Sequence, residues 1–219
     1  MSASPKLLSE APFASLFVYS PRSTPGEGEA GPKSRRLVRS IKNEARQFSQ
    51  KWSLAQFVRD NLGEERIGKF LEGAATLVPM PGHAPLRDEG SRWPARELCE
   101  EFVGVGLGAN WMPLLSRTSR VAKAAFSPPA ERPTALMHYS SMRCEGTIGP
   151  GARITVVDDV ITRGATMLAA ISLLQQTYPN AAVQGFALIR TMSDEPIRSV
   201  TEPASGTISL HGEETRRRP

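Results

Sequence analysis

The chain has 219 residues, of which 40% are hydrophobic and 22% charged, and its formal net charge at pH 7 is +5. This size fits one globular domain with or without an appendage, and no apolar run approaches the length of a membrane span, so we expect no transmembrane helix. The excess of Lys and Arg favours an anionic partner, either phosphate groups on a small molecule or nucleic acid, although a solvated basic surface explains it equally well.

The N-terminal segment, residues 1–34, combines a predicted strand with a flexible loop. Phe13–Tyr19 is apolar but lacks the charged region and small-residue cleavage site of a signal peptide, so it predicts a strand. Residues 20–34 are rich in Pro, Gly and Ser, which is typical of a flexible loop.

Two helices and a strand are predicted next. In RRLVRSIKNEARQF, which covers residues 35–48, apolar side chains recur at helical spacing and the outer face is basic. The apolar positions are Leu37, Ile41, Ala45 and Phe48. Trp52–Asn61 predicts a second helix, and Thr76–Val78 predicts a short strand that runs into Pro79–Gly82.

Pro94–Val103 predicts a helix because Pro94 suits the first helical position and Leu98, Phe102 and Val103 can face inward. The following GVGLG, Gly104–Gly108, comes after a helix rather than a strand, which favours a loose helix end over a dinucleotide-binding loop. Trp111–Leu115 predicts a further strand.

Residues 117–147 have no steady periodicity and contain a Pro-Pro pair. A long segment of this kind is usually either functional, often as a lid, or disordered. It carries five cationic side chains, Arg117, Arg120, Lys123, Arg132 and Arg143.

The clearest unit lies near the C-terminus. Ile154–Val157 predicts a strand, Thr166–Gln176 a helix and Val183–Ile189 a second strand, which together indicate a right-handed crossover in a parallel sheet. In the tail, Thr207–Leu210 predicts a short strand, and the basic end, TRRRP, is expected to fray.

Cysteine and histidine usage points to a protein without structural metal. Cys99 and Cys144 are far apart in sequence, which favours buried thiols over a disulfide and predicts a cytoplasmic location. The three histidines, His83, His138 and His211, are scattered, so no structural zinc site is expected.

The stretch ITVVDDVITRGAT, residues 154–166, places Asp158 and Asp159 at the predicted end of a buried strand. Two adjacent carboxylates are costly to bury unless they are paired or solvated, and ligands of parallel sheets bind at this edge. The loop after them contains Gly164 between Thr162 and Thr166 and leads to a helix N-terminus, which attracts anions. Together these features suggest a sugar phosphate. The alternative is that Asp159 or Thr162 only caps the helix while Asp158 is solvated.

VVDDVITRGAT closely resembles the phosphoribosyl-diphosphate (PRPP) signature of the type I phosphoribosyltransferases. More loosely, the IKNEAR stretch, LVPMPGHAPLRDEG and the Arg-rich middle are similar to the competence-associated ComF-type branch, with Arg87 and Gly90 in place. The resemblance implies an α/β fold of the type I phosphoribosyltransferase kind, an open parallel sheet flanked by helices with a small variable hood. The domain would span residues 35–195, with the hood at 116–147 and a tail at 196–219.

The resemblance also implies site residues. Asp158 and Asp159 would hold the ribose 2′- and 3′-hydroxyls and stabilise positive charge on the sugar. The 5′-phosphate would lie against Thr162, Arg163, Gly164, Ala165 and Thr166, and the diphosphate against Pro79, Met80, Pro81 and Gly82. Arg117, Lys123 or Arg132 would close over the diphosphate from the hood. Mg²⁺ would bridge diphosphate and ribose oxygens, with Asp158 or Asp159 as a candidate direct ligand.

The implied function is transfer of ribose 5-phosphate from PRPP to a nitrogenous acceptor, with release of diphosphate. The alternative is a PRPP- or nucleotide-binding regulator, or a ComF-like accessory protein of DNA uptake. The sequence does not identify the acceptor, and nucleic acid and a second copy of the chain are candidate partners.

Overall fold

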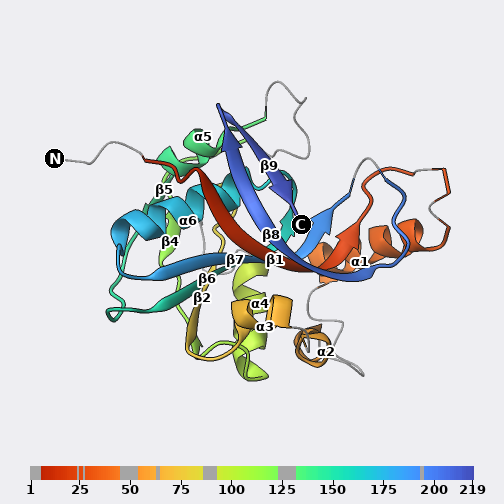
Figure 1. Cartoon of the computed structure of the whole chain (residues 1–219), viewed down its shortest axis with the longest axis horizontal. Coiled ribbons are helices and arrows are strands. Elements are labelled where there is room, and N and C mark those ends of the chain that lie inside the picture. The colour runs from red at the N-terminus through yellow and green to blue at the C-terminus, as the bar shows by residue number, and fades with distance from the viewer. Residues whose placement is uncertain are drawn as a thin grey trace.

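The computed structural model of the chain describes residues 6–23, 25–26, 28–44, 54–62, 65–85, 93–122, 132–192 and 195–219. Its main element is a seven-stranded sheet of order β3-β2-β6-β7-β1-β8-β9 with helices on both faces (Figure 1). The predicted α/β class, with an open and mostly parallel sheet flanked by helices, is therefore confirmed.

Five neighbouring strands are parallel, and the last two continue the sheet as an antiparallel hairpin. The parallel strands are β3 (Asn110–Trp111), β2 (Ala75–Pro79), β6 (Arg153–Ile161), β7 (Ala182–Thr191) and β1 (Glu10–Tyr19). The hairpin consists of β8 (Thr201–His211) and β9 (Glu214–Arg218). The strands predicted at the N-terminus, at residues 76–78 and around the crossover are confirmed.

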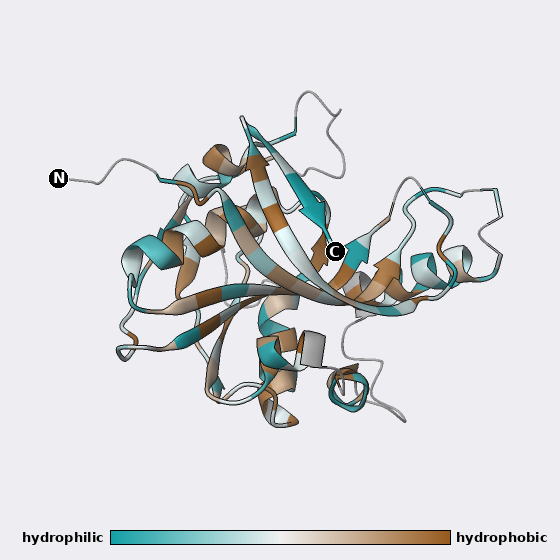
Figure 2. Ribbon diagram, viewed as in Figure 1, coloured by the Kyte–Doolittle hydropathy of each residue, from teal (hydrophilic) through white to brown (hydrophobic). Residues whose placement is uncertain are grey.

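Helices cover the two faces of the sheet and form two apolar cores (Figures 1 and 2). On one face lie α1 (Ala30–Glu44), α2 (Leu54–Asn61), α3 (Glu65–Leu71) and α4 (Pro94–Gly104). On the other lie α6 (Ala165–Thr177) and the short α5 (Ala135–Ser140). Because both faces are covered, all five residues of β2 are buried, and four of the five are apolar.

Several element predictions need correction. Helix α1 begins at Ala30, so residues 30–34 are helical rather than part of the predicted loop, and Ala45 and Phe48 lie outside the described residues. The short helix α3 was not predicted. The segment Trp111–Leu115 is not one strand: Pro113, which has no backbone N–H, separates β3 from β4 (Leu115–Arg117).

The described part of the predicted hood contains a small sheet and a short helix. β4 pairs antiparallel with β5 (Met142–Cys144) in a separate two-stranded sheet, and α5 lies between them in the chain. Within the described ranges, no helix combines the length and apolarity that crossing a membrane requires. Both cysteines are described and both are free thiols; Cys99 is buried as predicted, whereas Cys144 is only half-buried.

The C-terminal tail does not fray, contrary to expectation. The predicted short strand is the eleven-residue β8, and β9 pairs with it from Glu214 to Arg218. β8 in turn pairs with β1, which lies between β7 and β8 (Figure 1). The N-terminal strand β1 and the C-terminal hairpin are therefore neighbours in the same sheet that carries the crossover.

Candidate active site

Strand β6 extends past the acidic pair rather than ending before it. Asp158 pairs with Ala187 of β7, and the ladder continues to Ile161. The Asp158 carboxylate accepts a hydrogen bond from the Asp159 N–H at 2.9 Å, and the Asp159 carboxylate accepts one from the Val160 N–H at 2.8 Å. Pro79, the last residue of β2, pairs with Val157, so both Asp residues lie just beyond the carboxyl end of that neighbouring strand.

The loop between β6 and α6 is only Thr162–Gly164, and its geometry requires glycine. Gly164 is the N-cap of α6 with a φ of 91°, and a Cβ at this position would lie 2.7 Å from Cγ2 of Ile208. No side chain caps this helix end, so the alternative in which Asp159 or Thr162 serves as the cap is wrong. The N–H groups of the first turn and the positive end of the helix dipole therefore face outward from this loop.

A cavity of about 220 Å³ opens at this loop. It is lined by Asp158, by residues 160–167, by Arg132–Thr134 and His138 of the hood, and by Glu213–Thr215 of the C-terminal hairpin. The structure thus brings together seven predicted site residues, which are Asp158, Thr162, Arg163, Gly164, Ala165, Thr166 and Arg132. Asp159 is half-buried and does not line the cavity.

The loop after β2 lies next to the acidic pair but outside this cavity. Pro79 is in register with Val157, and the Met80 N–H donates to the Val157 carbonyl at 2.8 Å. The Trp93 indole N–H donates to the Met80 carbonyl at 2.6 Å, which fixes Pro79–Gly82 from the start of α4. No peptide bond between described residues is cis.

Arg117 is not a mobile cation above the site, as the hood prediction supposed. Its side chain is 7% exposed, and its guanidinium donates to the carbonyls of Gly82 and His138 and to the Ser141 hydroxyl. Burial lowers the pKa of Arg117 to about 10, and the nearby Asp158 carboxylate opposes this shift. Arg117 is therefore a fixed positive charge that joins the β2 loop to the hood.

The other predicted cations have different positions. Arg132 lines the cavity, and Arg163 is exposed at its edge. Lys123 lies outside the described residues, as do Arg87 and Gly90 of the stretch that resembles the ComF-type branch.

His138 is a site residue that the sequence analysis missed. It is 6% exposed and lies between the Arg117 Nη2 atom, 3.2 Å from its Nδ1, and the Thr166 Oγ1 atom, 3.2 Å from its Nε2. Burial, together with the positive charge of Arg117, lowers the pKa of His138 to about 4, so the ring is neutral near pH 7. A lone histidine in a segment without periodicity gave no signal of this contact.

The C-terminal hairpin supports the loop after β6, which the sequence also did not indicate. Arg217 of β9 donates from Nε to the Thr162 carbonyl at 3.0 Å and from Nη2 to the Thr191 carbonyl at 2.5 Å. Ile208 of β8 packs against Gly164. The hairpin therefore holds the back of the loop, while Glu213–Thr215 form one wall of the cavity.

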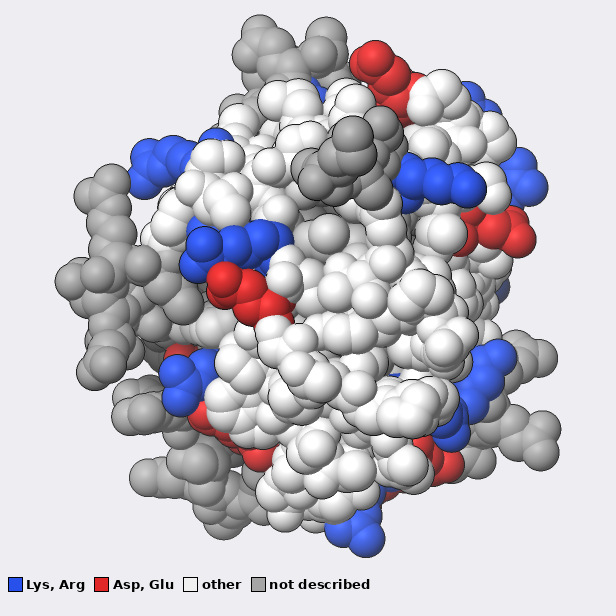
Figure 3. Space-filling model, turned by 90° about the vertical axis from the view of Figure 1, so that its left-hand side faces the viewer, with Lys and Arg blue, Asp and Glu red and all other residues white. Residues whose placement is uncertain are grey.

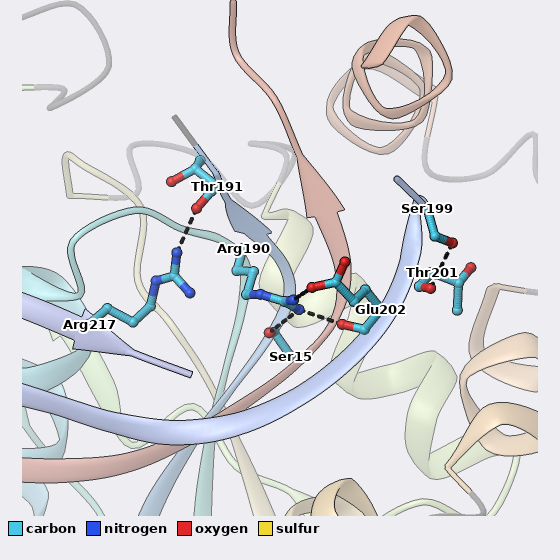
Figure 4. Close-up of polar contacts among 7 residues, drawn as sticks. All are labelled: Ser15, Arg190, Thr191, Ser199, Thr201, Glu202 and Arg217. Carbon is cyan, nitrogen blue, oxygen red and sulfur yellow. Dashed lines mark hydrogen bonds and ion pairs between the residues drawn. The ribbon is translucent and has the colours of Figure 1, made fainter. Parts of the chain in front are cut away.

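A buried arginine anchors this arrangement in the sheet (Figure 4). Arg190 of β7 is 1% exposed, forms an ion pair with Glu202 of β8 and donates to the Ser15 hydroxyl of β1 at 3.4 Å. Burial lowers the pKa of Arg190, and Glu202 opposes this shift. β7, β1 and β8 are thus tied together beside the strand that carries Asp158.

The residues are suited to only one kind of magnesium site. In the part of the chain that the structure describes, no group of three or more His, Cys, Asp or Glu side chains could enclose a metal ion. Three carboxylates line the cavity, those of Asp158, Glu213 and Glu214, and they do not form such a group. This arrangement fits an ion held mainly by ligand oxygens and water, as Mg²⁺ prefers, with few protein ligands.

No family model and no curated protein matches the chain. Among solved structures, it is similar to a hypoxanthine phosphoribosyltransferase from Staphylococcus aureus, at 12% identity over 72% of this chain and 76% of that chain, with a TM-score of 0.31. It is also similar to adenine phosphoribosyltransferases from Leishmania donovani (15% identity, 80% and 76% coverage, TM-score 0.32) and Leishmania tarentolae (15%, 80% and 83%, 0.29). With TM-scores of this size, neither the activity nor the substrate of these enzymes is transferred to the chain.

Proposed function

We propose that the protein is a phosphoribosyltransferase that moves ribose 5-phosphate from PRPP to a nitrogenous acceptor and releases diphosphate. One observation carries the proposal: Asp158 and the N-terminus of α6 line the same cavity. A carboxylate suits ribose hydroxyls and a developing positive charge, whereas a helix N-terminus suits a phosphate. A single phosphorylated pentose offers partners for both.

The expected roles follow from this placement. The N–H groups of Gly164, Ala165 and Thr166 would bind the 5′-phosphate, and Asp158 would accept hydrogen bonds from the ribose. As the bond from C1′ to the diphosphate oxygen breaks, positive charge grows on the sugar and negative charge on the diphosphate. A new bond then forms between C1′ and the acceptor nitrogen, which loses a proton.

Preorganised groups of this kind are each worth about 3 kcal/mol in catalysis. Asp158 would face the positive charge on the sugar, while the backbone of Pro79–Gly82 and Arg132 would face the diphosphate. Bound Mg²⁺ would neutralise charge on the diphosphate. We assign Asp159, which does not line the cavity, a smaller share of ribose binding than Asp158.

The test is a screen for diphosphate release from PRPP and Mg²⁺ against a panel of bases and small amines. We expect Asp158→Asn to lower turnover at least a hundredfold and Asp159→Asn to lower it less, with thermal unfolding of both variants close to that of the wild type. A protein that neither consumes PRPP nor releases diphosphate with any acceptor contradicts the proposal.

A second candidate function is a ComF-like accessory protein of DNA uptake, or a regulator that binds PRPP without turnover. It is favoured by exposed cations at Arg36, Arg39, Arg216 and Arg218. Figure 3, however, shows the described Lys and Arg side chains of one face in separate groups, several of them next to acidic ones, without a continuous basic patch. Binding to DNA that falls steeply with salt supports the accessory role, and binding of PRPP without diphosphate release supports the regulator.

The cytoplasm is the proposed location, because reduced thiols such as Cys99 and Cys144 are typical of that compartment.

A homodimer is proposed on the resemblance alone, and sedimentation of the purified protein tests it.

A further inference from the structure

We propose that His138 is a positioning residue that turns the Thr166 hydroxyl into a hydrogen-bond donor directed at a ligand oxygen in the cavity. The inference relies on the proposed function only for the identity of that ligand, a phosphorylated sugar. His138 and Thr166 both line the cavity.

The hydrogen-bonding roles follow from the partner of Nδ1. A guanidinium has only donors, and the Arg117 Nη2 atom lies 3.2 Å from the His138 Nδ1 atom, so Nδ1 must be the acceptor. A neutral imidazole with an accepting Nδ1 carries its proton on Nε2. The Nε2–H group therefore donates to the Thr166 Oγ1 atom at 3.2 Å.

Protonating His138 is opposed by its surroundings. A proton on Nδ1 would face the fixed positive charge of Arg117, and the ring is buried at 6% exposure. The other charged groups of this cavity are Asp158 on β6, Arg132 before α5, Arg163 in the loop, and Glu213 and Glu214 at the hairpin. Arg117 is the one in direct contact with the ring, so it sets the tautomer.

The Thr166 hydroxyl is then free to donate its own proton. Its oxygen accepts from His138, and it is the second residue of α6. A helical threonine often donates to the carbonyl four residues earlier, but here that residue, Thr162, precedes α6, and among the described residues the Thr166 hydroxyl contacts only His138. The hydroxyl proton is thus left for an acceptor in the cavity, beside the N–H groups of the helix N-terminus. A phosphate oxygen is the acceptor that this set of donors fits.

The first test needs no ligand. ¹⁵N-labelled ring nitrogens of His138, assigned by comparison with His138→Gln, report which nitrogen carries the proton. We expect the Nε2–H tautomer, unchanged between pH 8 and 5. A proton on Nδ1, or a titration of this ring centred near pH 6.5, overturns the inference.

The second test is a double-mutant cycle in ribose 5-phosphate binding, measured by calorimetry. We expect Thr166→Val and His138→Phe each to weaken binding about tenfold, and the double variant to be no weaker, because His138 acts only through the Thr166 hydroxyl. His138→Gln, whose amide can accept from Arg117 and donate to Thr166, should stay within about threefold of the wild type. His211→Gln is the matched control, because His211 is exposed outside the cavity.

Two outcomes of the cycle count against the inference: independent effects that multiply to about a hundredfold, and a His138→Phe variant that binds as the wild type does. If the wild-type protein binds no ribose 5-phosphate, the proposed function fails instead. The tautomer measured in the free protein then decides the role of His138 on its own.

Discussion

Two neighbouring loops at the carboxyl edge of the sheet are held in different ways. The loop after β6 has its shape from local geometry, the positive φ of Gly164 and the start of α6. The loop after β2, Pro79–Gly82, is fixed by side chains from elsewhere in the chain, Trp93 and Arg117. A short motif therefore identifies the first loop, whereas the second depends on contacts that span tens of residues.

The hood connects the two loops through one pair of side chains. Arg117 donates to Gly82 in the β2 loop and contacts His138, and His138 contacts Thr166 after the β6 loop. Under the proposed function, the β6 loop binds the 5′-phosphate and the β2 loop binds the diphosphate. Binding of ribose 5-phosphate and of inorganic diphosphate therefore reports on the two loops separately.

The largest effect is expected from Arg117→Ala. The change removes a buried donor from the Gly82 carbonyl and the Ser141 hydroxyl and leaves the His138 carbonyl with the Ser141 hydroxyl alone, so we expect a loss of about 3 kcal/mol in the free energy of unfolding, measured with urea. Diphosphate binding should weaken more than tenfold and ribose 5-phosphate binding by less.

Arg143→Ala is the matched control for Arg117, because Arg143 is exposed in the partner strand β5 and its ion pair with Glu145 is at the surface. Its effect should stay within about 0.5 kcal/mol. If Arg117→Ala weakened the binding of diphosphate and of ribose 5-phosphate equally, the two loops would not be held independently.

The next effect concerns pH and the residue that joins the loops. The pKa of His138 is about 4 in the folded protein and near 6.5 when exposed, so the unfolded chain binds a proton first as pH falls. Stability due to this group is complete above pH 6.5 and decreases down to pH 4, by an amount on the order of 3 kcal/mol. Urea unfolding between pH 7 and 4 measures it, with His138→Gln as the control that should lack this part of the slope. If the free energy of unfolding changed equally with pH in both proteins, the His138 side chain would be solvated in the folded state.

A smaller effect is expected in the β6 loop from Gly164→Ala. At a φ of 91° an alanine is strained, and its Cβ would contact Ile208, so we expect a loss of about 2 kcal/mol in the free energy of unfolding. Ribose 5-phosphate binding should weaken at least tenfold, while diphosphate binding changes little, the reverse of Arg117→Ala. Gly149→Ala serves as the control, because its Cβ would meet nothing within 4 Å.

The contrast between local geometry and long-range contacts also explains how much could be predicted from the sequence. The crossover, the acidic pair and the loop to α6 were predictable because periodicity and a glycine between two threonines are local signals. Local signals do not reach the roles of His138 and Arg217, since each acts on a residue far away in the chain. The basic end of the tail was expected to fray because its pairing with β8, and the pairing of β8 with β1, follow only from the whole sheet.

The smallest effect is expected at the back of the β6 loop, from Arg217→Ala. Arg217 donates to Thr162 and Thr191 and lies over the Phe13 ring at 5.7 Å. Because the side chain is half-buried and burial has already lowered its pKa to about 10, its removal also relieves a desolvation cost, and we expect a net loss of about 1 kcal/mol. Ribose 5-phosphate binding should weaken about threefold, since the Thr162 carbonyl is no longer fixed.

Its neighbours in β9 provide the comparison, because the side chains of Arg216 and Arg218 are exposed while Arg217 faces the loop. Arg216→Ala removes the same charge from the same strand, so any change that it shares with Arg217→Ala reflects net charge alone. Only a loss specific to Arg217→Ala indicates that the C-terminal hairpin holds the loop. Equal binding by the two variants would mean that the loop after β6 keeps its shape through Gly164 and α6 without the hairpin.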